Sequence, residues 1–254
     1  MRRGLRFSLA LAALVVVAGA ARAGEREDFI EGRARDCRGC DLAGVNFKRR
    51  DLSGADLTGA GLARANLHDA RLARARLVGA DLANANLNKA DLSSADLSGA
   101  KLAEAMLYGA RLEGAALADA DLRGAMMGAA RLTRADLSRA NAREADLRRA
   151  RFDDAKLEGA DLTGAALDFA LFRRARLRDA ILDAARLTGG DFSEADFAGA
   201  SLARALATGA IFRGCDFSRA MLAGADLRKA ILTDARFDGA NMSGARMPDG
   251  SLAE

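Results

Sequence analysis

Two cysteines three residues apart, Cys37 and Cys40, are the residues of this chain whose types and spacing could most directly do chemistry. Such a pair can form a disulfide, act as a redox dithiol, attach a haem or supply two metal ligands. No βαβ pattern surrounds it, as a thioredoxin-like motif would require. Asp41 stands where haem attachment needs a histidine, and a second ligand pair for a metal is absent. In an oxidising compartment the pair is a candidate disulfide that closes a very small loop.

Few other residues could support catalysis. His68 is the one histidine, and it lies at a position expected to point outward. The sequence holds no nucleophile elbow, phosphate loop or HExxH motif. The many aspartates recur at a fixed spacing, so the repeat itself explains them. We therefore expect no enzyme, no cofactor and no metal site.

The N-terminus is typical of an export signal. It starts with three arginines in six residues, continues with an apolar run over 7–21, and ends with the small-x-small triplet Ala21-Arg22-Ala23. The run is short for a membrane span. The sequence predicts a signal peptide over 1–23 and a mature protein that is periplasmic or secreted, with no membrane span after cleavage. An uncleaved anchor and a chance apolar start are the alternatives, and Arg2-Arg3 matches a twin-arginine signal poorly, which leaves the export route open.

Cleavage would also change the charge of the chain. Lys plus Arg would fall from 39 to 35, equal to the 35 Asp plus Glu. The high isoelectric point thus comes from the signal, and we expect no binding to nucleic acid.

A strict five-residue repeat dominates the rest of the sequence. From Leu42 to Met247 every fifth residue is Leu, Phe or Met, with Ala142 and Ala207 as exceptions, and the residue two places earlier is nearly always Ala. A period of five fits neither an α-helix nor a plain strand. Residues two apart in an extended segment point to one side, and the glycines that often follow favour a turn. The pattern predicts two extended residues, a corner and a repeat.

The units resemble those of the pentapeptide repeat family. Ala55-Asp56-Leu57-Thr58-Gly59 and Ala65-Asn66-Leu67-His68-Asp69 are typical copies, and the resemblance covers 38–247. It implies an all-β fold, the right-handed quadrilateral β-helix, with four units per coil. Residue n would then stack on residue n+20, in about ten coils and a rod on the order of 50 Å long.

The resemblance also bears on both ends. Cysteines at the start of the repeats are familiar in relatives, which favours a structural role for the Cys37–Cys40 pair. Residues 24–37 would form a cap, as a short helix or a strand, because an open coil edge invites pairing. The tail 248–254 lacks the helical module through which some relatives dimerise.

Two surface features follow from stacking at n+20. Outward apolar residues gather toward the C-terminus and form a candidate patch for a protein partner or for self-association, although tolerated variation would explain them too: Leu171, Ile181, Leu206, Ile211, Met221 and Ile231. Arg111, Arg131 and Arg151 would stack as like charges. We interpret them as solvated arginines balanced by nearby acids rather than as an anion-binding strip.

The sequence therefore predicts an exported, non-catalytic structural or protein-interaction scaffold with an unknown partner. Some relatives mimic DNA and protect topoisomerases, but that role requires a strongly acidic rod. Ice or mineral binding would need long ladders of identical residues, which the mixed charges here do not provide.

Overall fold

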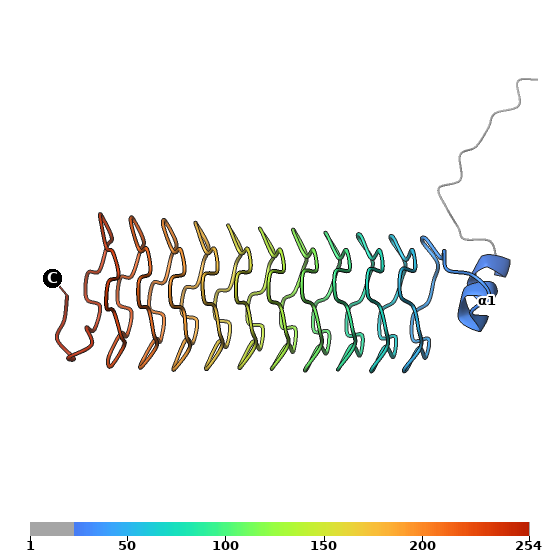
Figure 1. Cartoon of the computed structure of the whole chain (residues 1–254), viewed down its shortest axis with the longest axis horizontal. Helices are drawn as coiled ribbons and strands as arrows, with labels where there is room; N and C mark the ends of the chain where they lie inside the picture. The colour runs from blue at the N-terminus through green and yellow to red at the C-terminus, as the bar shows by residue number, and fades with distance from the viewer. Residues whose placement is uncertain (1–22, 254) are drawn as a thin grey trace, which may run out of the picture.

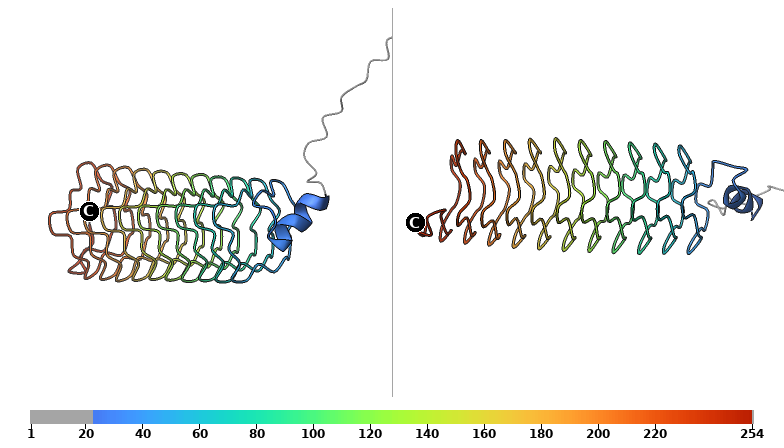
Figure 2. Two further views of the ribbon diagram at one scale, coloured as in Figure 1. Left: turned by 45° about the vertical axis from the view of Figure 1, so that its right-hand side comes forward. Right: turned by 60° about the horizontal axis from the view of Figure 1, so that its bottom comes forward.

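The computed structural model describes residues 23–253 of the chain as one rod of stacked coils (Figure 1). The predicted signal peptide falls outside these residues except for Ala23. One helix, α1 (Ala23–Glu31), lies at the N-terminal end of the rod, and the C-terminus lies at the other end (Figure 2). Within residues 23–253 no helix is long and apolar enough to cross a membrane.

Parallel backbone bridges join each residue of the ladder to the residue twenty places later, from Asp36 to Arg246. The amide of Leu57 donates to the carbonyl of Arg76 at 2.7 Å, and that of Asp56 donates to Arg35 at 2.8 Å. The bridges are isolated ones, and no continuous strand forms between residues 23 and 253. Each side of a coil is extended over too few residues for a strand, because a turn follows every pair.

The coil has four faces, each of which we name by one of the large apolar residues, or centres, that stack beneath it. The Leu57, Leu62, Leu67 and Leu72 faces follow one another around the rod, and each repeats every twenty residues. Centres and the alanines two places before them fill the interior: Ala55 and Leu57 are both fully buried. A narrow interior of this kind accepts one large and one small side chain per unit.

Phenylalanines replace leucine in the C-terminal half of the core. Phe152, Phe172, Phe192 and Phe212 stack under the Leu72 face with ring centroids 4.4 to 5.2 Å apart. Cys215 takes an alanine position and is fully buried. Its thiol donates to the carbonyl of Phe192 at 2.9 Å, and burial raises the pKa of that thiol to about 12.

The corners explain the remaining residue preferences of the unit. The Asp56 carboxylate accepts from the amide of Thr58 at 3.1 Å, which makes a local turn of the kind that Asp and Asn favour. The amide of Ala60 then donates to the carbonyl of Leu57 at 3.0 Å. Gly59 between them has φ +65°, where glycine avoids the steric cost of a side chain.

Both ends of the rod carry a cover. At the N-terminus, Phe29 of α1 is buried and its ring meets Phe47 edge to face, with centroids 5.9 Å apart. At the C-terminus the tail folds back, so that Leu252 forms an antiparallel bridge with Arg246. Of the two forms expected for the N-terminal segment, the structure has the helix.

Candidate functional site

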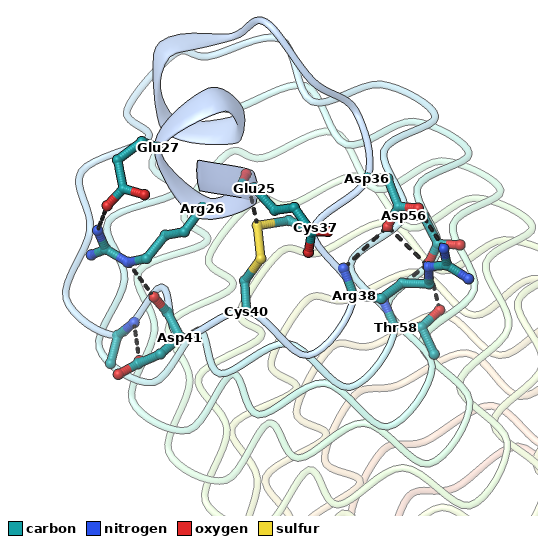
Figure 3. Close-up of a disulfide and its surroundings, with 11 residues drawn as sticks. Glu25, Arg26, Glu27, Asp36, Cys37, Arg38, Cys40, Asp41, Asp56 and Thr58 are labelled. Atoms are coloured by element: carbon teal, nitrogen blue, oxygen red, sulfur yellow. Dashed lines mark hydrogen bonds and ion pairs between the residues drawn. A yellow bond between two sulfur atoms is a disulfide. The ribbon is translucent and has the colours of Figure 1, made fainter. Parts of the chain in front are cut away.

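Cys37 and Cys40 are joined by a disulfide where the ladder begins (Figure 3). Cys37 occupies a centre and Cys40 an alanine position, and both are buried. The Arg26 side chain of α1 donates to the carbonyl of Asp41 at 2.7 Å, beside the bridge. The disulfide and α1 together close the first coil. Between residues 23 and 253, no three His, Cys, Asp or Glu side chains are placed to hold a metal ion.

The stacked arginines have acidic neighbours. Arg111, Arg131 and Arg151 follow one another along the Leu72 face. Arg131 lies 2.7 Å from Glu113, and Arg151 lies 3.7 Å from Asp153. Acidic side chains thus lie beside the three stacked arginines, as expected if nearby acids balance their charge.

The six residues of the predicted apolar patch lie on three faces. Leu171, Ile211 and Ile231 share the Leu72 face, where Asp191 separates the first two. Ile181 and Met221 share the Leu62 face, with Ser201 between them, and Leu206 lies on the Leu67 face. Only Ile211 and Ile231 are direct neighbours in the ladder. The patch stays a prediction, but a flat partner could contact only part of it.

A different apolar feature lies on the Leu67 face. Tyr108 and Phe169 are 58% and 57% exposed, and they are the two exposed aromatic residues of the part of the chain that the structure describes. Between them lies a shallow recess of about 500 Å³, lined by Tyr108, Gly128, Ala129, Asp146, Arg148, Arg149, Asp168, Phe169 and Arg186. We call this site the recess.

Glycine makes room for both rings. A Cβ at Gly128 would lie 3.3 Å from Cδ2 of Tyr108, and one at Gly189 would lie 2.7 Å from Cε1 of Phe169. Each ring therefore leans over the residue twenty places later. Other outward side chains lean in the same direction, such as Glu104 over Gly124.

Phe169 also holds an unfavourable backbone conformation. Its φ of +59° lies in the left-handed region, which bulky residues avoid. Phe169 is the second residue after its centre, and in many units this position holds glycine. Among the non-glycine residues with positive φ between residues 23 and 253, Phe169 is the one aromatic. The fold thus keeps a large apolar side chain in solvent at a steric cost.

The floor of the recess carries paired and unpaired charges. Arg148 donates two hydrogen bonds to Asp146, at 2.7 and 2.6 Å, and Arg186 donates one to Asp168 at 2.6 Å. The bonds from Arg148 hold the pKa of Asp146 below its usual value, although burial opposes them. The two carboxylates of the recess pair with Arg148 and Arg186. Among residues 23–253, no carboxylate lies within 4.0 Å of the Arg149 guanidinium. Arg149 is thus the unpaired cation between the two rings.

Comparison with known families decides what kind of protein this is. The family profile described as pentapeptide repeats matches the chain in eight copies across residues 36–249. The chain belongs to the pentapeptide repeat family. Members of this family are generally non-catalytic, and their fold is the right-handed quadrilateral β-helix.

Solved structures of the same family resemble this pentapeptide repeat protein. HetL, a protein involved in heterocyst differentiation regulation from the cyanobacterium Nostoc sp. strain PCC 7120, is 35% identical, with 92% of this chain and 100% of HetL covered and a TM-score of 0.49. A trypsin-treated form of QnrB1, a plasmid-mediated fluoroquinolone resistance protein, is 20% identical over 67% of this chain and 87% of its own, with a TM-score of 0.55. The likeness to QnrB1 concerns the fold. No curated protein sequence matches the chain.

The recess of this pentapeptide repeat protein is not among the sites predicted from its sequence. Two signals could have found it. Tyr108 is the only tyrosine of the chain and lies just after a centre, at an outward position. Phe169 lies one position further on, where the other units have glycine, polar, charged or alanine residues.

Proposed function

We propose that this protein is exported and acts as a rigid, non-catalytic scaffold that binds a partner protein through the recess. In this proposal residues 1–23 direct export and are removed, and the mature rod of about ten coils works in the periplasm or outside the cell. The observation that carries the proposal is the pair of exposed aromatic rings, Tyr108 and Phe169, on either side of Arg149. Tyrosine and arginine are prominent among the residues that dominate binding energy at protein interfaces.

Two further properties support a scaffold. A solenoid stabilises each coil through its neighbours, so its outer residues are free to vary without loss of the fold. Charges of both signs cover the rod, and many of them pair between coils, for example Arg139 with Asp119 and Arg174 with Asp154. A surface of mixed charges does not reproduce the continuous negative charge of DNA, which argues against DNA mimicry.

Photocrosslinking tests the interaction. A photoreactive phenylalanine analogue replaces Tyr108 in one variant and Val78 in the other. Val78 is a matched control because it holds the same position in its unit on the Leu57 face, opposite the recess. We expect a defined covalent adduct with a protein of the exported fraction from position 108 alone. The adduct should disappear when Phe169→Gly is added, and equal adducts from both positions would contradict the proposal.

Export is tested separately. Residues 1–30 are fused to a reporter enzyme that becomes active only after it crosses the inner membrane. We expect activity, and cleavage near Ala23 seen as a shift in mass. An inactive, uncleaved fusion would overturn the export part of the proposal and leave the scaffold part standing.

A further inference from the structure

The recess combines two features that point to the chemistry of its partner. Its ends are aromatic, and Arg149 is its one charged side chain without an ion-pair partner among residues 23–253. We infer that the recess binds an extended acidic segment of a partner protein, in which an apolar side chain lies between Tyr108 and Phe169 and a carboxylate pairs with Arg149. This inference rests on the proposed scaffold function and specifies its partner.

The size of the recess fits such a segment. Tyr108 and Phe169 are about three coils apart, which corresponds to about 14 Å at the usual spacing of paired strands. Four residues of extended chain span about 13 Å. The Tyr108 ring covers Gly128, but Ala129 beside it has only a methyl side chain, so the floor next to the ring admits a side chain of the partner.

Charge favours an acidic partner. Asp146 and Asp168 already accept hydrogen bonds from Arg148 and Arg186, so the arginine that remains gives the recess a net positive charge. The Leu67 face has the same sign here, because its five units from 106–110 to 186–190 hold three arginines against two acids. A hydrogen bond between a guanidinium and a carboxylate is stronger than one between neutral groups.

A nucleic acid fits the recess less well than an acidic peptide. Phosphates follow one another closely along a strand, whereas the recess offers a single cation, Arg149, that has no carboxylate partner within 4.0 Å among residues 23–253. A peptide can place its carboxylate at Arg149 and an apolar residue elsewhere.

The chain provides its own reporter for the test. It has one tyrosine and no tryptophan, so the intrinsic fluorescence of the protein reports on Tyr108 and hence on the recess. The probe is a blocked hexapeptide of alternating Glu and Leu, which does not fluoresce. Hexapeptides of alternating Lys and Leu and of alternating Glu and Gly test the charge and the apolar side chain, and a six-nucleotide oligothymidylate tests the nucleic-acid alternative.

We expect a saturable change in Tyr108 fluorescence with the Glu-Leu peptide, weakened at least tenfold by Arg149→Gln and weakened further by salt. The matched control is Arg134→Gln. Like Arg149, Arg134 has φ +60° and no carboxylate within 4.0 Å in the described chain, but it lies on the neighbouring face and should not matter. Phe169→Gly should also weaken binding, and it preserves the fold because glycine suits a φ of +59°.

Equal binding of the Lys-Leu peptide, tighter binding of the oligothymidylate, or no effect of Arg149→Gln would overturn the inference. So would the absence of binding by the Glu-Leu peptide. If position 108 still crosslinks to an exported protein in that case, the scaffold function stands and only the acidic partner is wrong. If crosslinking fails too, both fall.

Discussion

The ring of Phe192 occupies the space that a side chain at Gly190 would need. A Cβ at Gly190 would lie 2.7 Å from Cε2 of Phe192, and its position is one that holds alanine in most units. The position of the Phe192 ring therefore requires the missing methyl group. The other phenylalanines of the stack, Phe152, Phe172 and Phe212, keep alanine at that position.

Gly190→Ala should destabilise the protein by about 1 to 3 kcal/mol, the usual cost of overpacking a core. Urea unfolding followed by circular dichroism measures the change. Gly61→Ala is the matched control, because a Cβ there would meet only ordinary contacts at 3.7 Å or more and its φ is not positive. Equal midpoints for the two variants would contradict the packing argument.

Reduction of the Cys37–Cys40 disulfide should loosen the N-terminal coil alone. A loop this short contributes about 2 kcal/mol in the chain-entropy model, and a solenoid transmits little of that to distant coils. We expect faster amide exchange at Gly39, which donates to Thr58, and in α1, with no change near the phenylalanine stack. The double variant Cys37→Ser, Cys40→Ser should not respond to reductant. Faster exchange along the whole rod would show that the cap controls global stability.

Asp226 should make stability depend on pH. Two hydrogen bonds from Arg228, at 2.9 and 2.6 Å, lower the pKa of Asp226 to about 2, against a partial opposing effect of burial. Because this pKa is lower in the folded chain than the usual unfolded value of about 3.9, the stabilisation is present above about pH 4 and is lost as the pH falls toward 2.

Asp226→Asn should therefore lower the urea midpoint at pH 7 and show a smaller loss between pH 4 and pH 2.5 than the unaltered protein. Asp238→Asn is the control, since the Asp238 side chain is 84% exposed and should not affect the midpoint. If the urea midpoints of Asp226→Asn and of the unaltered protein fall equally between pH 4 and pH 2.5, Asp226 is not the source of the pH dependence.

The Ile211–Ile231 pair tests the predicted apolar patch as a self-association surface. Stable interfaces bury about 800 Å² on each partner, which two neighbouring side chains do not supply. We expect light scattering of residues 24–254 to give a monomer at all concentrations, both for the natural sequence and for Ile211→Asp with Ile231→Asp. A dimer that this variant abolishes would show instead that the patch self-associates.

Much of the fold could be predicted from the sequence because every unit repeats the same pattern of buried residues and turn. Ala55 and Leu57 point inward, and a turn follows, so the period follows from counting and the family from the resemblance of the units. The form of the cap did not follow, since 24–37 has no repeat and Phe29 is identified as a core residue only by its contact with Phe47.

The recess could not be predicted in the same way. Tyr108 and Phe169 lie three coils apart and at different positions of their units, so no spacing in the sequence pairs them. Their approach depends on the coil length and on the direction in which outward side chains lean, and Gly128 and Gly189 show that direction only in the structure.

The twenty-residue ladder also sets how such a protein can change its length. A duplication of five residues between Tyr108 and Phe169 would move Phe169 a quarter turn, onto the neighbouring face, and separate the two rings. A duplication of twenty would keep both on one face and lengthen the recess by about 4.8 Å. Duplication of whole coils thus changes the distance between aromatic residues on one face in steps of one coil.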